Sequence, residues 1–286
     1  MENVNKEPYV VGGKSYTAVA INTAAKTGQW IKSKLGDFNS IDVKYSSQDL
    51  VTEVDKGSEK MIRKLIMTHF PQHSFLGEEG VEPGPAASAL ALQNVSHAEY
   101  LWIVDPIDGT TNFIHGFPFY TVSIALAYKG EVIVGVVYDP SSDELFVAEK
   151  GKGAYVHGKK MQVSADDKLS NSLIATGFPS DRNTALPINL KGIQSIAPKV
   201  RNIRSAGSAA LHLAYVADGR LSGFWEIGLN SWDIAAGALL IQESGGTITD
   251  TEGKPYSLAV RNVIGSNTLI HGELQQELSA AEATGF

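Results

Sequence analysis

The sequence predicts a mixed α/β protein in which a sheet-rich first half packs against a second half of alternating strands and helices. Two apolar runs rich in Val, Ile and Tyr, 120–128 and 131–138, flank Lys129-Gly130 and predict a β-hairpin. Short runs separated by glycine turns, 145–149, 153–156 and 161–163, extend this antiparallel sheet. The alternation that follows is typical of an α/β unit. We expect the two halves, 1–165 and 166–286, to form one compact unit.

The second half is expected to alternate between strands and helices along its whole length. Strand patterns cover 172–176, 200–204, 221–226, 247–249 and 263–266. Helical patterns cover 185–196, 208–217, a segment that starts at Ser231, and a last segment that runs through Leu278.

Two helices are expected near the start of the chain. Residues 15–35 show an amphipathic pattern that stops at Gly36, and a second helical pattern ends in Phe70 before Pro71. Residues 1–14 are polar and are expected to form a loose tail. Residues 82–99 are rich in Pro, Gly and Ala without clear periodicity, and we expect a surface insertion there.

Composition excludes several classes of protein. The chain has 286 residues, no cysteine and a formal net charge of −7, so disulfides, thiolate metal sites and a basic nucleic-acid surface are not expected. An apolar content of 43% is enough for a sizeable core. No apolar run approaches the length of a membrane span, and the start of the chain lacks a signal-peptide core. We therefore expect a cytoplasmic protein.

One stretch, 101–113, combines groups that suit both a cation and a phosphate. Its apolar start fits a buried strand, which Pro106 is expected to end near Asp105. Asp105 and Asp108 would then project from the strand end and the following turn. Gly109-Thr110-Thr111-Asn112 adds a flexible backbone, two hydroxyls and an amide. The alternative for this stretch alone is an ordinary Asp-Gly turn with Asp105 as a cap.

Three other segments offer carboxylates, and each also has a simpler explanation. Glu78 and Glu79 follow an apolar lead-in and could face one site, or could form a solvated acidic loop. Asp55 precedes a helical pattern and could be its N-cap. Asp233 lies in the first turn of a helix, and its role could be limited to a favourable interaction with the helix dipole. Lys44 is interpreted as an ordinary surface lysine, and His69 and His73 as surface residues.

The motifs together resemble those of the inositol monophosphatase family, within the lithium-sensitive phosphatase superfamily. The resemblance rests on Gly77-Glu78-Glu79, on Asp105-Pro106-Ile107-Asp108-Gly109-Thr110-Thr111 and on Trp232-Asp233-Ile234-Ala235-Ala236-Gly237, in that order, with Asp49-Leu50-Val51-Thr52 and Asp55 upstream. It covers the chain from about Lys44 to the C-terminal helix. Because one shared site would explain all of these carboxylates, we prefer it to a separate simpler explanation for each.

The resemblance implies a layered α-β-α-β-α sandwich, as in inositol monophosphatase and fructose 1,6-bisphosphatase. It implies a Mg²⁺ site of two or three ions, for which Mn²⁺ could substitute, and an all-oxygen ligand set is what Mg²⁺ prefers. By family position the ligands are Glu78, Asp105, the Ile107 carbonyl, Asp108, Asp233 and Glu79. Glu78 and Thr110, with Asp55 orienting Thr110, would position and deprotonate the attacking water.

The implied activity is hydrolysis of a small phosphate monoester, myo-inositol 1-phosphate or a related polyol or sugar phosphate. The substrate would contact, by family position, Asp108, Gly109, Thr110, Thr111, Gly207, Ser208, Ala209 and Glu226. The last of these could alternatively face solvent. A fructose 1,6-bisphosphatase, a bisphosphate-nucleotide or NADP phosphatase, and a regulatory binding protein remain alternatives. The resemblance also implies a homodimer and inhibition by Li⁺, with no nucleic-acid or membrane partner.

Overall fold

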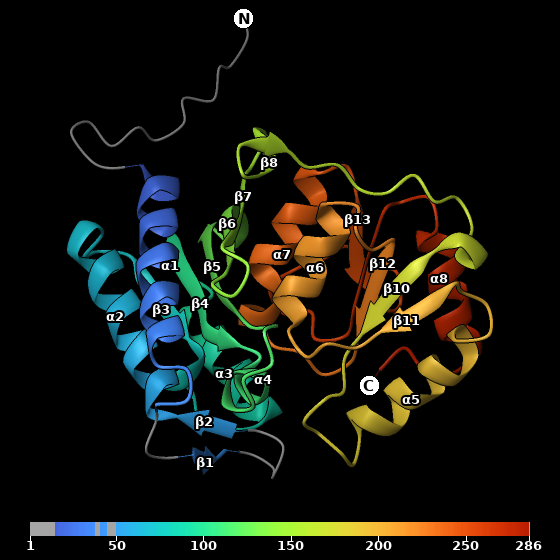
Figure 1. Cartoon of the computed structure of the whole chain (residues 1–286), viewed down its shortest axis with the longest axis horizontal. Helices are drawn as coiled ribbons and strands as arrows, with labels where there is room; N and C mark the ends of the chain where they lie inside the picture. The colour runs from blue at the N-terminus through green and yellow to red at the C-terminus, as the bar shows by residue number, and fades with distance from the viewer. Residues whose placement is uncertain (1–14, 38–40, 45–49, 286) are drawn as a thin grey trace, which may run out of the picture.

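A computed structural model describes residues 15–37, 41–44 and 50–285 of the chain (Figure 1). The predicted tail and Asp49 lie outside these residues. The main sheet has the strand order β3-β4-β5-β6-β7-β8-β9, with β3 and β4 parallel and the other neighbours antiparallel. Its strands are β3 (Ser74–Gly77), β4 (Tyr100–Asp108), β5 (Thr121–Tyr128), β6 (Glu131–Asp139), β7 (Glu144–Glu149), β8 (Gly153–Val156) and β9 (Lys159–Lys160).

The second sheet has the order β11-β10-β12-β14-β13, with β10 parallel to both β11 and β12 and the β12–β14–β13 pairs antiparallel. Its strands are β10 (Leu173–Thr176), β11 (Asn202–Arg204), β12 (Gly223–Glu226), β13 (Thr247–Asp250) and β14 (Val263–Ser266). A small antiparallel pair, β1 (Ile41–Val43) and β2 (Leu50–Thr52), stands apart. Short 3₁₀ turns are η1 (Glu78–Gly80) and η2 (Leu169–Asn171).

Helices cover both sheets and separate them, which confirms the layered α-β-α-β-α sandwich (Figure 1). The outer layer on the main sheet is α1 (Tyr16–Ser33) and α2 (Glu53–His69), and the outer layer on the second sheet is α5 (Ala185–Ile196) and α8 (His271–Ala280). Between the sheets lie α6 (Ala209–Ala217) and α7 (Ser231–Glu243). Two further helices, α3 (Pro85–Val95) and α4 (Thr110–Ile114), flank the strand ends.

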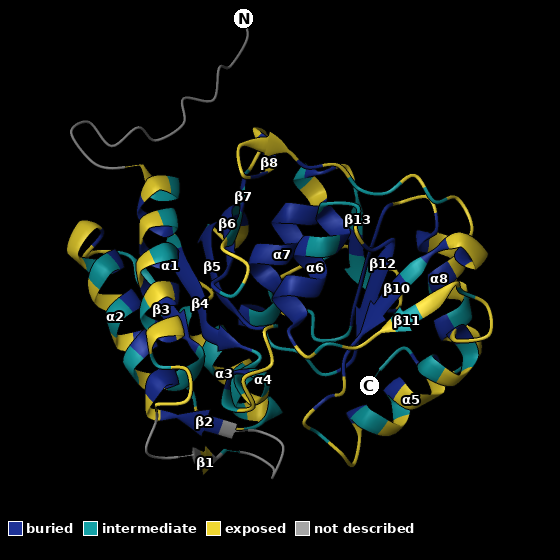
Figure 2. Cartoon of the chain, in the orientation of Figure 1, coloured by how far each residue is buried: buried dark blue, intermediate teal, exposed yellow. Residues whose placement is uncertain are grey.

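Strand alternation distributes the core over these layers. On β4, Trp102 and Val104 pack with α1 and α2, whereas Leu101 and Ile103 pack with α6 and α7, because successive strand residues face opposite ways. A third cluster joins Trp225 of the second sheet to α5 and α8. The central helices are dark along most of their length in Figure 2, as expected for helices buried between two sheets.

Three elements differ from the sequence prediction. Pro106 does not end β4, which continues to Asp108 with a shift in pairing between Asp105 and Asp108. The predicted strand 161–163 is wrong, because β9 pairs only over Lys159–Lys160 before the chain leaves the sheet. The insertion contains α3, which begins with Pro85 at a position where a missing N–H costs nothing.

The histidine interpretation holds for one residue and fails for the other. His69 is exposed at the end of α2. His73 is partly buried, accepts a hydrogen bond from Trp102 Nε1 at 3.0 Å, and stacks on Tyr100 with ring centroids 4.5 Å apart. His73 is therefore part of the aromatic packing beneath α1 and α2 and is not a surface residue.

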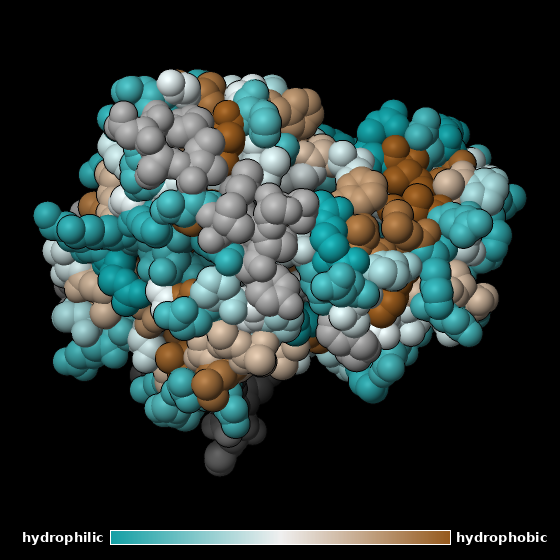
Figure 3. Space-filling model, turned by 90° about the horizontal axis from the view of Figure 1, so that it is seen from below, coloured by the Kyte–Doolittle hydropathy of each residue, from teal (hydrophilic) through white to brown (hydrophobic). Residues whose placement is uncertain are grey.

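Some large apolar side chains remain outside the core. Phe117, Phe178 and Leu190 are each about half exposed, at 51%, 52% and 45%. Seen from below, the molecule shows hydrophobic residues gathered in patches among hydrophilic ones (Figure 3). No helix in the described parts of the chain is long and apolar enough to cross a bilayer.

Candidate active site

The two aspartates of β4 face the same side because the strand contains a bulge. Asp105 pairs with Ser123 and Asp108 with Thr121, so three steps on β4 match two on β5. In a regular strand, residues three apart would face opposite sides. The Asp105 carboxylate accepts the Ile107 N–H at 2.9 Å, which fixes the bulge from within. Both carboxylates consequently point into the space between the two sheets.

A lysine lies between the two glutamates that follow β3. Lys44 Nζ is 2.8 Å from Glu78 Oε1 and 2.6 Å from Glu79 Oε1, so the interpretation of Lys44 as an ordinary surface residue is wrong. Burial lowers the pKa of Lys44, but the two glutamate charges outweigh this effect and raise it overall. The Glu79 N–H also donates to Glu59 at 2.7 Å. The sequence signal for Lys44 was indirect, since a dense acidic cluster calls for a counter-cation.

Asp55 links the start of α2 to Thr110. One carboxylate oxygen accepts the N–H and the hydroxyl of Thr52, at 2.8 and 2.6 Å, as part of a capping box. The other accepts the Thr110 hydroxyl at 2.8 Å. Thr110 Oγ1 also lies 3.0 Å from the Ile107 carbonyl oxygen. The simpler explanation of Asp55 as the N-cap is wrong, because Thr52 is the N-cap and Asp55 is the third residue of the helix; its carboxylate stabilises the helix start and also orients Thr110.

Asp233 reaches the same region from α7. Its carboxylate accepts the Asn230 N–H at 2.7 Å, so it satisfies a free backbone donor at the start of that helix. The small residues that follow let α7 approach its neighbours: a Cβ on Gly135 would lie 2.7 Å from the Ala236 carbonyl, and one on Gly237 would lie 2.5 Å from Leu213. This close packing holds Asp233 against the strand ends.

Mutual repulsion and burial perturb the acidic residues together. Burial raises the pKa of Asp105 well above its usual value, and the charges of Glu78, Asp108 and Asp233 add to the increase. Burial likewise raises the pKa of Asp108 to about 6, although the hydrogen bonds that its carboxylate accepts act in the opposite direction and lower it. Such interactions require these carboxylates to lie near one another. The structure thus brings together acidic residues from β4, η1 and α7.

Glu226, at the end of β12, belongs to the same cluster. Its side chain is buried against Gly177, where an added Cβ would overlap the carboxylate. Burial raises the pKa of Glu226 well above its usual value, and the charges of Asp108 and Asp233 contribute. The alternative that Glu226 faces solvent is therefore wrong.

The loop before α6 packs against the Asp108–Gly109 turn. Ser208 Oγ and the Ala210 N–H donate to Asp108 Oδ2 at 2.6 and 2.7 Å. Gly109 has a φ of +99°, and an added Cβ would lie 3.1 Å from the Gly207 carbonyl oxygen, so only glycine fits this turn. Gly207 and Thr111 are exposed, whereas Ala209 is buried. The predicted substrate residues thus border the acidic cluster.

The donor set fits a hard divalent cation in its chemistry. It consists of carboxylate oxygens and one carbonyl, and their crowded negative charge is what a cation would neutralise. In the parts of the chain that the structure describes, no three acidic or histidine side chains already surround a single point. Instead, the carboxylate oxygens accept hydrogen bonds from the Lys44 ammonium group and from backbone N–H groups. Binding of a metal would therefore require these side chains to adjust.

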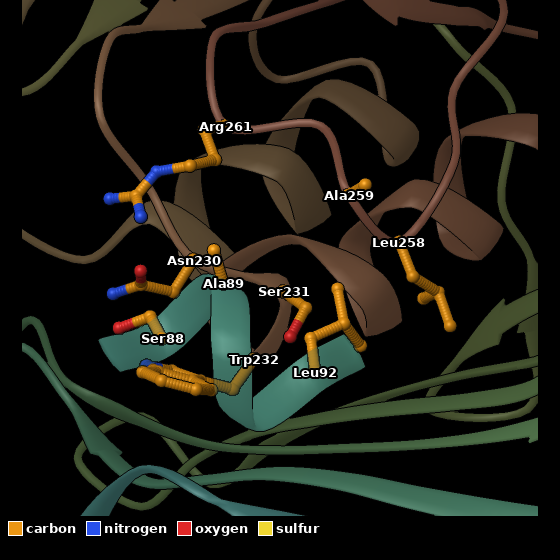
Figure 4. A pocket seen from close by; sticks show the side chains of 9 residues that line it. All are labelled: Ser88, Ala89, Leu92, Asn230, Ser231, Trp232, Leu258, Ala259 and Arg261. Carbon is orange, nitrogen blue, oxygen red and sulfur yellow. The ribbon is translucent and has the colours of Figure 1, made fainter. Parts of the chain in front are cut away.

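The insertion that contains α3 supports the helix that carries Asp233. Arg261 donates to the carbonyls of Pro85 and Gly228 at 3.0 and 3.1 Å, which ties the start of α3 to the segment before α7. A small cavity of about 80 Å³ lies beside this contact (Figure 4). It is lined by Ser88, Ala89, Leu92, Asn230, Ser231, Trp232, Leu258, Ala259 and Arg261.

We expect the metal-free protein to lose stability as the pH rises from about 4.5 to about 7. Burial and the Glu78 charge raise the pKa of Glu79 from 4.5 to about 7. Above pH 4.5 the unfolded chain releases this proton while the folded chain keeps it, so the free energy of unfolding falls as the pH rises. Urea unfolding in EDTA at several pH values measures the slope.

Glu79→Gln is the matched control, because it removes one of the titrating groups and should make the slope shallower, while Asp105, Asp108 and Glu226, whose pKa values are also raised, keep the rest of it. Added Mg²⁺ should also flatten the slope, because a cation favours the ionised carboxylates. A free energy of unfolding that increases over this pH range in EDTA would contradict the electrostatic account of the cluster.

The geometry defines an acidic cluster between two sheets with a glycine turn suited to an anion, and comparisons with known proteins identify the class of protein. A sequence model described as the inositol monophosphatase family matches residues 14–283. The chain belongs to this family.

Individual relatives agree with the family match. Inositol monophosphatase 2 of Solanum lycopersicum is 40% identical over 273 residues, which cover 94% of this chain and 100% of the relative. A Pseudomonas aeruginosa protein named Nus factor SuhB is 40% identical and covers 87% and 90%. The solved structure of a Thermotoga maritima IMPase has a TM-score of 0.82 at 34% identity and covers 92% of this chain and 96% of its own.

Proposed function

We propose that the protein is a Mg²⁺-dependent phosphomonoesterase that hydrolyses myo-inositol 1-phosphate or a related polyol phosphate. The observation that carries the proposal is the convergence of Glu78, Asp105, Asp108 and Asp233 beside the Asp55–Thr110 pair. Family membership supports the reaction class. The ligands would be these four carboxylates with the Ile107 carbonyl and Glu79, and two or three ions would be held.

When bound, the ions supply positive charge to the phosphate oxygens and lower the pKa of the attacking water. The remaining roles belong to the chain. The Thr110 hydroxyl donates to Asp55, so its oxygen is left to accept a hydrogen bond from that water and thereby orient it. Glu78 would accept the proton that the water releases. The backbone of Gly109–Thr111 would hold the phosphate.

The substrate hydroxyls would be received on the opposite side of the pocket. Glu226 and the Gly207–Ala209 segment border Asp108 and are proposed to contact the ring. A buried carboxylate accepts hydrogen bonds from a polyol and disfavours a second phosphate nearby, because like charges repel. This argument favours inositol phosphate over fructose 1,6-bisphosphate and nucleotide bisphosphates.

A panel of phosphomonoesters assayed with Mg²⁺ tests the proposal. We expect turnover of myo-inositol 1-phosphate, dependence on Mg²⁺ or Mn²⁺, and inhibition by Li⁺. Preference for a bisphosphate would select one of the alternative phosphatases. Absence of turnover with every compound would favour the regulatory binding alternative, to which the name of the Pseudomonas relative also points.

Homodimerisation is proposed as well, from the resemblance to the family. Light scattering coupled to size-exclusion chromatography measures the mass in solution. A single species of 30.6 kDa would contradict the homodimer.

Glu226→Gln should lower kcat/KM for inositol 1-phosphate by roughly tenfold, the effect of weakening one charge-assisted hydrogen bond. The same change should narrow the preference over fructose 1,6-bisphosphate, because the repelling charge is gone. Both substrates are measured with both proteins. Glu243→Gln is the matched control, since in the described part of the chain this carboxylate accepts hydrogen bonds from the amides of Gly151 and Gly153 and not from the acidic cluster. An unchanged preference ratio in Glu226→Gln would remove Glu226 from the substrate contacts.

A further inference from the structure

The loop proposed to receive substrate hydroxyls is held at Ala206 by two side chains. The Ala206 N–H donates to His212 Nε2 at 3.2 Å. The Ala206 carbonyl accepts a hydrogen bond from Asn112 Nδ2 at 2.6 Å. Both backbone polar groups of this residue are therefore fixed, one from α6 and one from α4. Gly207 and Ser208 follow directly.

Asn112 connects this loop to the proposed phosphate turn. Its Nδ2 also donates to the Phe119 carbonyl at 2.7 Å, so the amide joins two backbone segments. Gly207 has a φ of +92°, and an added Cβ would lie 2.9 Å from the same Nδ2 atom. Asn112 lies on α4, directly after the Gly109–Thr111 segment. A shift of the amide would therefore be felt on both sides of the pocket.

His212 is an unexpected residue for the interior of α6. Its ring is buried between Phe119 and Phe224, with centroid distances of 5.1 and 5.4 Å. Burial lowers the pKa of His212 to about 3, so the ring is neutral at ordinary pH. Because Nε2 accepts a hydrogen bond, the proton is on Nδ1, and Nδ1 has no hydrogen-bond partner among the described residues.

An unpaired buried N–H costs free energy, and an apolar side chain would fill the same space without that cost. The contribution of the imidazole must therefore come from Nε2, its one satisfied polar atom. That atom bonds Ala206, two residues before the hydroxyl that donates to Asp108.

We propose that His212 and Asn112 are positioning residues that hold Ala206 from both ends and so place Gly207 and Ser208 for the hydroxyl groups of a polyol phosphate. The proposal rests on the proposed function. Neither residue need touch the substrate or a metal. Loss of either contact would let the loop move away from Asp108, and binding of the ring would weaken more than transfer of the phosphate.

The test compares His212→Leu with His212→Gln on two substrates. Leucine removes the acceptor, whereas the glutamine carbonyl can replace it. With His212→Leu we expect KM for myo-inositol 1-phosphate to rise roughly tenfold with little change in kcat, as for lost uniform binding. p-Nitrophenyl phosphate has no ring hydroxyls, so its kcat/KM should change by less than about twofold. His212→Gln should restore the inositol phosphate KM.

Asn112→Asp tests the other contact, because a carboxylate cannot donate to the Ala206 carbonyl; it should raise the inositol phosphate KM and, because Asn112 also adjoins the phosphate turn, cause a smaller loss with p-nitrophenyl phosphate. Hydrogen exchange of the Ala206 amide, followed by NMR, measures the contact without any assay. Exchange should be faster in His212→Leu and slow again in His212→Gln.

Three results would overturn the proposal: an inositol phosphate KM unchanged in His212→Leu, equal losses on both substrates without rescue by Gln, or unaltered amide exchange. Failure of the proposed function is distinguishable, because the unmodified protein would then not hydrolyse inositol 1-phosphate. In that case the amide exchange result alone decides whether His212 holds the loop.

Discussion

Asp105→Asn should abolish turnover while leaving the protein folded. An amide binds Mg²⁺ far more weakly than a carboxylate, and several kcal/mol of transition-state stabilisation would be lost, so kcat should fall roughly a thousandfold or more. The amide oxygen can still accept the Ile107 N–H that fixes the bulge. Burial and the charges of Glu78, Asp108 and Asp233 disfavour the ionised form of Asp105. The metal-free variant should therefore be at least as stable as the original protein.

The measurement pairs kcat at saturating Mg²⁺ with thermal unfolding in EDTA. Asp139→Asn is the matched control, because Asp139 is also buried at a strand end but binds Ser141 and Ser142 instead of the cluster. The control should retain activity. Near-normal turnover by Asp105→Asn would rule out Asp105 as an essential metal ligand.

Thr110→Ala should reduce kcat by about a hundredfold with little change in KM, the scale expected when a group that aims the attacking water is lost. The hydroxyl is held by Asp55 at 2.8 Å and by the Ile107 carbonyl at 3.0 Å, so its orientation is fixed before substrate arrives. Removal of this hydroxyl takes away the acceptor for the water and leaves the carboxylate ligands in place.

Thr110→Ser is the control, since serine keeps the hydroxyl and should retain most of the activity. Initial rates over a range of inositol 1-phosphate concentrations separate kcat from KM in both variants. A Thr110→Ala variant whose kcat stays within about threefold of the original would show that the water is positioned by other groups.

Local chemistry was sufficient to predict many elements of the fold. Lys129 and Gly130 both have positive φ, at 50° and 84°, so the predicted hairpin has the turn that its strands require. The helix at 185–196 and the strand at 263–266 have the predicted bounds, since each segment has a clear pattern of apolar residues with turn residues on both sides. The layered arrangement came from the resemblance, because periodicity does not say which sheet a helix covers.

The acidic residues were predictable one by one, but their surroundings were not. Lys44 reaches Glu78 and Glu79 from a small strand pair that the pattern did not reveal. Proline usually ends a ladder, yet here β4 continues past Pro106, because the Asp105 carboxylate satisfies the next free N–H. His212 reads as one polar residue on an apolar helix, and only the folded loop gives its ring a partner.

The bulge in β4 makes strand register, as much as residue identity, a condition for Asp105 and Asp108 to share one side of the sheet. Two residues separate them in the chain, and one of these is the extra residue that the partner strand does not match. Regular pairing over the same three steps would turn Asp108 towards the core beneath α1 and α2, because residues three apart in a regular strand face opposite sides. A change that removes the bulge while keeping both residues between the aspartates would thus separate the two carboxylates without altering either of them.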